Sequence, residues 1–298
     1  MAEPMPDWQG AFLAQHQLPP AYLDNALKWF VPVGELLREH QSGASGPVLV
    51  GVNGCQGSGK STLCDYLCEW FAAECGLRAI ALSLDDFYLT QSERCQLAED
   101  VHPLLATRGV PGTHDMPLLL STLDALLEGE PVQVPRFDKA VDDRMPADAS
   151  PRVDEPVDLV LLEGWCMGAT AQPEDTLAEP RNELERDEDG DGRWRSYVNT
   201  TLAEQFPPLY QRVDEWIMLQ APSFDCVYEW RLEQEQKLAS RSDGGAIMSS
   251  AQVARFIQFY QRITEHCLEA LPRCVNHLFR LNSERRIESY LAAPGRRL

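Results

Sequence analysis

An apolar strand that runs directly into a glycine-rich loop dominates the sequence. Residues 47–62 read Pro-Val-Leu-Val-Gly-Val-Asn-Gly-Cys-Gln-Gly-Ser-Gly-Lys-Ser-Thr and contain the complete pattern G-x-x-x-x-G-K-[ST]. The glycines let successive backbone N–H groups point at an anion with no Cβ in the way. A helix is expected at 61–75, and the dipole at its N-terminus would add to the same site. The segment therefore predicts a phosphate-binding loop between a strand and a helix.

Two side chains at the end of this loop have predictable roles. The ammonium of Lys60 would lie on the β- and γ-phosphates of a nucleotide, and the hydroxyl of Ser61 would ligate Mg²⁺. Gly54, Gly57 and Gly59 supply the conformational freedom that the turn requires. An ordinary glycine-rich turn would lack the buried strand before it and the amphipathic helix after it, so we expect a nucleotide site.

Short apolar runs alternate with predicted helices along the rest of the chain. The runs cover residues 48–52, 79–84, 157–162, 216–220 and 277–281. The helices are predicted at 61–75, 116–128, 196–211, 226–239 and 249–270. Apolar strands separated by helices are typical of a parallel sheet covered on both faces. The pattern predicts a P-loop NTPase-type, three-layer α/β fold with a mainly parallel five-stranded sheet, and ligands at the carboxyl ends of its strands.

Two segments lie outside this alternation. Residues 1–46 form a predicted N-terminal helical extension, and residues 47–298 form the main domain. Within that domain, an acidic insert covers about residues 172–195. Its stretch Asp187 to Gly192 imitates the start of a calcium loop, but Val198 stands where a bidentate carboxylate would be needed. We therefore expect a solvated acidic loop there.

Composition argues against several classes of protein. The net charge of −20 opposes binding to nucleic acid or to anionic membranes. No window approaches about eighteen consecutive apolar residues, so a membrane span is not expected. The nine cysteines include no C-x-x-C pair, and Cys64 and Cys68 are interpreted as buried free thiols. A cytoplasmic protein with a small-molecule substrate is expected, and the oligomeric state is left open.

Carboxylates follow two of the predicted strands. Asp85 and Asp86 come directly after the second strand, which we expect beside the loop-bearing strand, so that one of them faces the γ-phosphate. That carboxylate would accept a proton from an attacking hydroxyl or hold Mg²⁺ through water. Asp85 is preferred because it immediately follows the strand, but the sequence does not separate the two. Glu163 ends the third strand and is expected to order Mg²⁺ and its water shell.

Basic residues between these two strands indicate an anionic acceptor. They are Arg108, Arg136, Lys139 and Arg144. The planar fork of arginine suits a carboxylate, because it binds both oxygens. The alternative is that some of these cations pair with carboxylates of the same segment, namely Asp138, Asp142 and Asp143. His114 either donates to a substrate or braces its loop.

A lid is predicted after the fourth strand, at about residues 226–248. Arg231 is the candidate to close on the phosphates and expel water. A solvated Arg/Glu face of a helix is the alternative. The sequence has neither an N-K-x-D nor an L-S-G-G-Q-like motif, which argues against a regulatory GTPase and a transporter ATPase.

Six motifs occur in a fixed order over roughly residues 47–282. They are Gly-Cys-Gln-Gly-Ser-Gly-Lys-Ser, Ser-Leu-Asp-Asp-Phe-Tyr-Leu, Arg-Gly-Val-Pro-Gly-Thr-His-Asp, Val-Pro-Arg-Phe-Asp-Lys, Leu-Glu-Gly-Trp and Trp-Arg-Leu-Glu-Gln-Glu. Together they resemble the D-glycerate 3-kinase family, within the uridine kinase, phosphoribulokinase and pantothenate kinase group of P-loop kinases. The insert at 172–195 is longer and more acidic than in the plant-type members of that family.

The resemblance implies ATP and Mg²⁺ as cofactors and assigns residues to roles. The ATP phosphates would bind Gly54, Cys55, Gln56, Gly57, Ser58, Gly59, Lys60, Ser61 and Thr62. The catalytic residues would be Lys60, Asp85, Asp86 and Arg231. The metal ligands would be Ser61, Asp85 and Glu163. The acceptor pocket would be lined by Arg108, His114, Asp115, Arg136 and Lys139.

The expected function is transfer of the γ-phosphoryl group to a hydroxyl of a small anionic acceptor, with D-glycerate favoured. A nucleoside or pantothenate-like acceptor is the first alternative, which Phe87, Tyr88 and Phe137 keep open. An ATP-binding regulatory protein without acceptor turnover is the second, and the carboxylates at 85 and 163 count against it. The topology suggests that adenine lies near residues 282–286.

Overall fold

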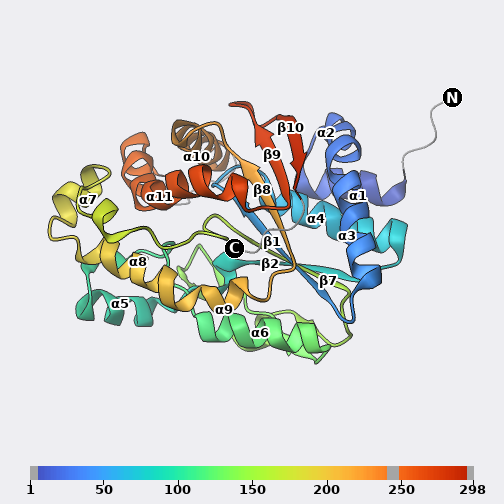
Figure 1. Ribbon diagram of the computed structural model, residues 1–298, viewed down its shortest axis with the longest axis horizontal. Coiled ribbons are helices and arrows are strands. Elements are labelled where there is room, and N and C mark those ends of the chain that lie inside the picture. The colour runs from blue at the N-terminus through green and yellow to red at the C-terminus, as the bar shows by residue number, and fades with distance from the viewer. Residues whose placement is uncertain (1–5, 240–247, 294–298) are drawn as a thin grey trace.

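The computed structural model describes residues 6–239 and 248–293, and in that part of the chain six strands form the central sheet (Figure 1). They are β1 (Val48–Gly54), β2 (Ala79–Ser83), β7 (Leu159–Gly164), β8 (Glu215–Gln220), β9 (His277–Leu281) and β10 (Ile287–Ala292). Their order is β10-β9-β8-β1-β7-β2. All neighbours pair in parallel except β9 and β10. The predicted parallel α/β sheet is confirmed, with one antiparallel edge strand in addition.

The sixth strand, β10, was not predicted because it lacks a continuous apolar run. β10 lies at the edge of the sheet, and its residues are half-buried or exposed. The pattern that identified the other strands is burial on both faces, which an edge strand does not need.

Helices occupy both faces and the ends of the sheet (Figure 1). They are α1 (Asp7–His16), α2 (Ala21–Asn25), α3 (Val31–Gly43), α4 (Lys60–Trp70), α5 (Gln91–Asp100), α6 (Met116–Glu128), α7 (Glu183–Glu188), α8 (Arg193–Gln205), α9 (Pro207–Tyr210), α10 (Phe224–Ala239) and α11 (Ser250–Ala270). Two small ladders pair β3 (Val132–Gln133) with β6 (Arg152–Val153) and β4 (Phe137–Asp138) with β5 (Asp143–Arg144).

Helix ends follow local signals in the sequence. Ser249 and Gln252 form a capping box at the start of α11, and Asp115 caps α6. A glycine at positive φ ends α6 at Gly129. Four of the five predicted helices are present with small shifts at their ends, and the one predicted at 196–211 is divided into α8 and α9 before Pro207.

The sheet buries side chains in strict alternation, which makes two hydrophobic layers. Val50 and Leu161 point to the layer formed with α1, α3, α4 and α10, whereas Leu49 and Leu162 point to the layer formed with α6, α8, α9 and α11. This period of two is what a strand imposes on its side chains. Each fully buried leucine or valine contributes roughly 1.5–3 kcal/mol relative to exposure, so the sheet is a rigid platform for the residues at its carboxyl edge.

The strand order differs from the sequence-based expectation at one place that matters for the site. β7, not β2, lies beside β1, with Val52 opposite Glu163, and β2 is the edge strand next to β7. Glu163 therefore lies directly between the loop after β1 and the acidic pair after β2. Chain order does not determine spatial order in a parallel sheet, because each crossover can pass a neighbouring strand.

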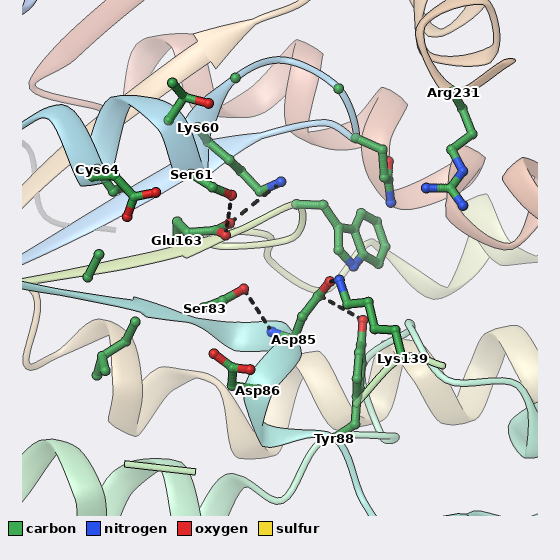
Figure 2. Close-up of a pocket in the computed structure, with 18 of the residues that line it drawn as sticks. Lys60, Ser61, Cys64, Ser83, Asp85, Asp86, Tyr88, Lys139, Glu163 and Arg231 are labelled. Carbon is green, nitrogen blue, oxygen red and sulfur yellow. Dashed lines mark hydrogen bonds and ion pairs between the residues drawn. The ribbon is translucent and has the colours of Figure 1, made fainter. Parts of the chain in front are cut away.

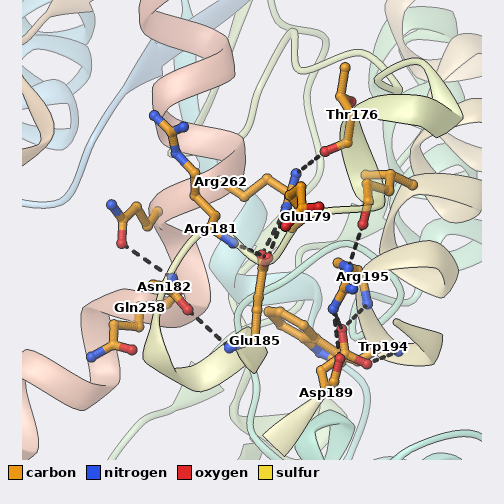
Figure 3. Close-up of polar contacts among 12 residues, drawn as sticks. Thr176, Glu179, Arg181, Asn182, Glu185, Asp189, Trp194, Arg195, Gln258 and Arg262 are labelled. Carbon is orange, nitrogen blue, oxygen red and sulfur yellow. Dashed lines mark hydrogen bonds and ion pairs between the residues drawn. The ribbon is translucent and has the colours of Figure 1, made fainter. Parts of the chain in front are cut away.

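Most acidic residues of the insert are exposed, as its composition predicts, but two of its carboxylates are buried (Figure 3). Glu185 is 1% exposed and Asp189 is fully buried. Asp189 accepts hydrogen bonds from the backbone N–H of Trp194, at 2.8 Å, and from Nη1 of Arg195, at 2.9 Å. Its carboxylate oxygens are therefore used inside the protein, although Asp189 also lies with His102 and Asp191 in a group whose possible ligand atoms are all within 4.8 Å of one another. In the described residues no helix is long and apolar enough to cross a membrane.

Candidate active site

The loop between β1 and α4 has the backbone that its glycines predict. Gly57 and Gly59 have φ of 79° and 93°, in the left-handed region that favours glycine. Gly54 has no room for a side chain, since an added Cβ would lie 2.5 Å from Oγ of Ser58. α4 begins immediately afterwards at Lys60, so the first N–H groups of an eleven-residue helix face the mouth of the loop. This arrangement favours an anion.

Lys60, Ser61 and Glu163 converge beside the loop (Figure 2). The hydroxyl of Ser61 donates to Oε1 of Glu163 at 2.7 Å, and Nζ of Lys60 lies 3.5 Å from Oε2. Burial alone would lower the pKa of Lys60, but the charges of Glu163 and Asp85 outweigh it and raise that pKa. Lys60 is therefore a permanent cation at the bottom of the pocket.

The same three residues fit a hydrated Mg²⁺. Oε2 of Glu163 is buried and accepts no hydrogen bond in the described structure. A hard carboxylate oxygen next to a serine hydroxyl is the donor set that Mg²⁺ takes while it keeps several waters. Oε2 lies 3.5 Å from Nζ of Lys60, and a water of the metal's shell would give it a hydrogen-bond donor.

Asp85 faces this group across the pocket, at the end of β2 (Figure 2). It belongs to the short helical turn Leu84–Phe87, whose N-cap Ser83 accepts the N–H of Asp85. Oδ1 accepts the hydroxyl of Tyr88 at 2.7 Å, and Oδ2 accepts Nζ of Lys139 at 2.6 Å. Burial raises the pKa of Asp85, but Lys139, Lys60 and Tyr88 together hold it lower, at about 2. Asp85 is therefore ionised at any working pH.

Asp86 has a different environment, although it is the next residue. Its Oδ2 accepts Nη1 of Arg136 at 2.8 Å, and its Oδ1 accepts the backbone N–H of Phe137 at 3.1 Å. Burial raises the pKa of Asp86, and Arg136 only partly offsets this. Both oxygens hold the start of the β4–β5 ladder in place. The geometry separates two aspartates that the sequence left equivalent.

The predicted cations each pair with a carboxylate of the protein. Besides the pairs with Lys139 and Arg136, Arg108 pairs with Asp142, and Arg144 donates to Asp115 at 3.0 Å. The guanidinium of Arg108 also lies 5.4 Å from the ring centre of Phe137. The segment 108–144 thus contains cations that line the pocket and cations that pair within the protein, which are the two roles that the sequence left open.

Two of the predicted acceptor residues do not line the pocket. His114 is 3% exposed and stacks on Tyr88 with ring centres 4.7 Å apart. Burial lowers the pKa of His114 to about 4. Asp115 caps α6 by accepting the N–H of Leu118 and binds Arg144 with its other oxygen. The expectation that they contact the acceptor is corrected, because both serve the loop that carries Tyr88.

The remaining predicted residues meet in one pocket of about 650 Å³. The predicted residues in its wall are Gln56, Gly57, Gly59, Lys60, Ser61, Thr62, Asp85, Asp86, Arg108, Arg136, Lys139, Glu163 and Arg231. Gly54, Cys55 and Ser58 are not among the lining residues and support the loop from behind. Arg231 reaches from α10 toward the pocket (Figure 2), with its guanidinium 5.5 Å from the ring centre of Phe256.

The pocket also contains residues that the sequence did not single out. Trp165, Phe256 and Tyr260 line it, as does Arg285. Trp165 belongs to the motif Leu-Glu-Gly-Trp, directly after Glu163 and Gly164, so the sequence did carry a signal that it lies near the site. The two aromatic residues of α11 look like ordinary core positions in an amphipathic helix, so the sequence carried no signal for them.

Arg285 belongs to the segment 282–286, which was expected near adenine. It pairs with Glu233 of α10 and lies 5.9 Å from the ring centre of Trp230. The location of adenine stays a prediction. Residues 240–247 of the predicted lid lie outside the described residues.

Comparisons with known proteins agree with this geometry. No family model matches the chain. The chain is 32% identical over 254 residues to an uncharacterized kinase, mug58, of Schizosaccharomyces pombe. The aligned region covers 76% of this chain and 87% of that protein. It is 31% identical over 224 residues to the chloroplastic D-glycerate 3-kinase of Arabidopsis thaliana. This aligned region covers 72% of this chain and 46% of that protein.

A solved structure gives the same relationship. The D-glycerate 3-kinase of Cryptococcus neoformans superposes with a TM-score of 0.72 at 29% identity, over 89% of this chain and 97% of that one. The similarity thus extends over most of the chain and is not confined to a local motif. The chain belongs to the D-glycerate 3-kinase-like family of P-loop kinases.

Proposed function

We propose that this kinase transfers the γ-phosphoryl group of ATP to a hydroxyl of D-glycerate. One observation carries the proposal: Asp85 stands opposite Lys60 in the same pocket, Lys139 pairs with Asp85, and Arg108 lines the same pocket. The pocket thus offers Lys60 for the phosphates of ATP, Asp85 for the hydroxyl of the acceptor, and Lys139 and Arg108 for the carboxylate of the acceptor. The two relatives whose names include D-glycerate 3-kinase support the choice of acceptor.

The phosphate half would be built from the loop and α4. Residues 54–62 would surround the phosphates through backbone N–H groups, and Lys60 would bind the β- and γ-phosphate oxygens. Ser61 and Glu163 would hold Mg²⁺, with Asp85 contributing through water. The metal, when bound, supplies charge neutralisation on the transferred phosphoryl group. Arg231 would close from α10 and add a further positive charge.

The acceptor half would be built around Asp85. Its low pKa makes it a weak base, but phosphoryl transfer has a loose transition state in which the hydroxyl proton leaves late. Asp85 would therefore act mainly by orienting the hydroxyl, with Tyr88 holding the carboxylate in place. The acceptor carboxylate would take the ammonium of Lys139 and the fork of Arg108.

The test is ADP release by the purified protein with Mg-ATP, alone and with D-glycerate, L-glycerate, uridine or pantothenate. We expect a large stimulation by D-glycerate and a new phosphomonoester signal in phosphorus NMR. Lys60→Ala is the control for contaminating kinases, since it removes the loop ammonium. Stimulation by uridine or pantothenate alone would refute the acceptor. ATP binding without stimulation by any alcohol would favour a regulatory protein.

The coarse organisation of the chain forms part of the proposal. Residues 1–46 are taken as a helical extension, residues 47–298 as the kinase domain, and about 226–248 as its lid. The net charge of −20 and the nine free cysteines support a cytoplasmic protein without nucleic-acid or membrane partners.

A further inference from the structure

The insert at 172–195 contacts α11 at several places, and among the described residues Arg262 makes the largest number of the hydrogen bonds between them (Figure 3). Nε and Nη2 of Arg262 donate to the two oxygens of Glu185 at 2.8 and 2.6 Å. The same guanidinium donates to the carbonyl oxygens of Thr176, at 2.9 Å, and of Glu179, at 2.8 Å. Arg262 therefore binds two separate parts of the insert at once, and the carboxylate that it holds is almost completely buried.

Backbone contacts fix the position of the insert along α11. Nδ2 of Asn182 donates to the carbonyl oxygen of Gln258 at 2.9 Å. In return, Oε1 of Gln258 accepts the backbone N–H of Leu184 at 2.8 Å. These reciprocal contacts join α7 to α11 beside the Arg262 pair.

The buried ion pair between Glu185 and Arg262 contributes more to geometry than to stability. Removing two charges from water costs free energy that an apolar contact would not, so a buried pair is weak evidence for added stability. What a bidentate pair provides is geometry, because both partners must meet in one orientation. Glu185 and Arg262 therefore define where α11 lies more than how firmly the domain folds.

The opposite side of α11 faces the acceptor half of the pocket. The ring of Tyr260 packs edge-on against Trp165 with centres 4.9 Å apart, and its hydroxyl lies 3.4 Å from the carbonyl oxygen of Arg108. The packing is tight, since a Cβ added to Gly109 would lie 2.4 Å from that hydroxyl. A small displacement of α11 would therefore move the Arg108 turn.

α8, which continues the insert, contacts the same turn from another side. A Cβ added to Gly112 would lie 2.5 Å from the ring of Tyr197. The loop that carries Arg108 is thus enclosed by α11 and α8, and both are joined to the insert.

We propose that Arg262 is a positioning residue for acceptor binding, acting through Tyr260. Its pair with Glu185 holds α11 in the register that presses Tyr260 onto the Arg108–Gly109 turn, so that Arg108 is presented to the acceptor. The phosphate-binding loop is built on β1 and α4, away from this contact, although Arg231, which the proposed function adds to the phosphate half, lies against Phe256 of α11. The inference rests on the proposed function, because it takes Arg108 as part of the acceptor half.

The test compares wild type with the double variant Glu185→Gln/Arg262→Met. This change removes the pair without leaving a buried charge alone, and glutamine keeps an acceptor for the backbone N–H of Arg181 that Glu185 now binds at 2.7 Å. We expect KM for the acceptor to rise about fivefold or more, with KM for ATP within about twofold of wild type. The single variant Arg262→Lys keeps the charge but loses the fork, and should give an intermediate KM.

The matched control is Glu188→Gln/Arg255→Met. Arg255 and Glu188 form a bidentate pair between the same two helices, with Nη2 to Oε2 at 2.6 Å, but both are exposed. The control should keep both KM values. The inference is overturned if the Glu185/Arg262 variant keeps the acceptor KM, if both KM values rise together, or if the control variant behaves in the same way.

Hydrogen–deuterium exchange of the full chain gives a readout that needs no acceptor. We expect faster exchange in residues 106–115 of the Glu185/Arg262 variant and an unchanged rate in residues 54–62, because only the first segment is enclosed by α11 and α8. Equal rates in 106–115 for the variant and wild type would overturn the inference. If no acceptor stimulates wild type, the proposed function fails, and the exchange result still decides whether the pair positions this loop.

Discussion

A buried histidine beside the site makes the stability of this protein sensitive to mild acid. His114 is 3% exposed, and neither Nδ1 nor Nε2 has a hydrogen-bond partner in the described structure. Burial lowers its pKa from 6.5 to about 4, although the charge of Asp85 acts in the opposite direction. Between these two values the unfolded chain binds the proton and the folded protein does not. Stability therefore falls as the pH decreases from about 6.5 to about 4.

The magnitude follows from the two pKa values. At about 1.4 kcal/mol for each tenfold change in proton affinity, His114 alone lowers the free energy of unfolding by roughly 2.5 kcal/mol between pH 7.5 and 4.5. Asp85 does not contribute in this window, because a carboxyl with a pKa of about 2 loses its stabilisation only at lower pH. The contributions of other groups that titrate in this range cancel when the change in the free energy of unfolding of each variant is compared with that of wild type.

Urea unfolding at pH 7.5, 6.5, 5.5 and 4.5 measures the effect. His114→Gln and His114→Phe cannot take up a proton, and the second also keeps a ring against Tyr88. The two variants will differ in stability at pH 7.5, since they pack differently. Both should lose roughly 2.5 kcal/mol less than wild type on going to pH 4.5. If either variant loses as much stability as wild type over this range, His114 is not the buried neutral group that the structure indicates.

Two predictions concern catalysis. Lys60→Ala should lower kcat about a thousandfold or more, because a buried ammonium directed at the transferred phosphate is lost, and turnover within a few-fold of wild type would contradict the loop assignment. Asp85→Asn should lower kcat by at least about a hundredfold and should also lower the melting temperature, because the depressed pKa of Asp85 means that its charge stabilises the fold. Asp86→Asn should lower kcat less than Asp85→Asn does, since Asp86 holds Arg136 and Phe137 and not the acceptor. Steady-state kinetics and thermal melts of both variants measure this, and the reverse pattern would exchange the two roles.

The fold was predictable where the physical signal is local. Residues 47–62 combine a buried run, glycines at defined positions and a helix start, and each of these acts within a few residues. The five apolar runs likewise record burial on both faces, which is a property of each strand by itself. β10 was missed because an edge strand needs no such run.

The acceptor half was only partly predictable. Arg108, Arg136 and Lys139 were found by their charge, and Asp142 was among the carboxylates named as their possible partners. The pairs of Arg136 with Asp86 and of Lys139 with Asp85 were not predicted, since an ion pair between distant residues depends on how two loops meet. His114 and Asp115 were assigned to the acceptor by the family resemblance, and in the structure His114 is buried and Asp115 binds Leu118 and Arg144. Tyr260 had no signal at all, because a tyrosine in an amphipathic helix looks like any core residue.

The sequence alone therefore defined a phosphate-binding loop, a parallel sheet and a pair of acidic strand ends, since periodicity, glycine conformation and strand termini are short-range properties. The tertiary structure decided the rest. It placed β7 between β1 and β2, and so brought Glu163 next to Ser61. It also separated Asp85 from Asp86 and turned an acidic insert into a buried contact with α11. Each of these depends on residues that are far apart in the chain and meet only when the packed elements bring them together.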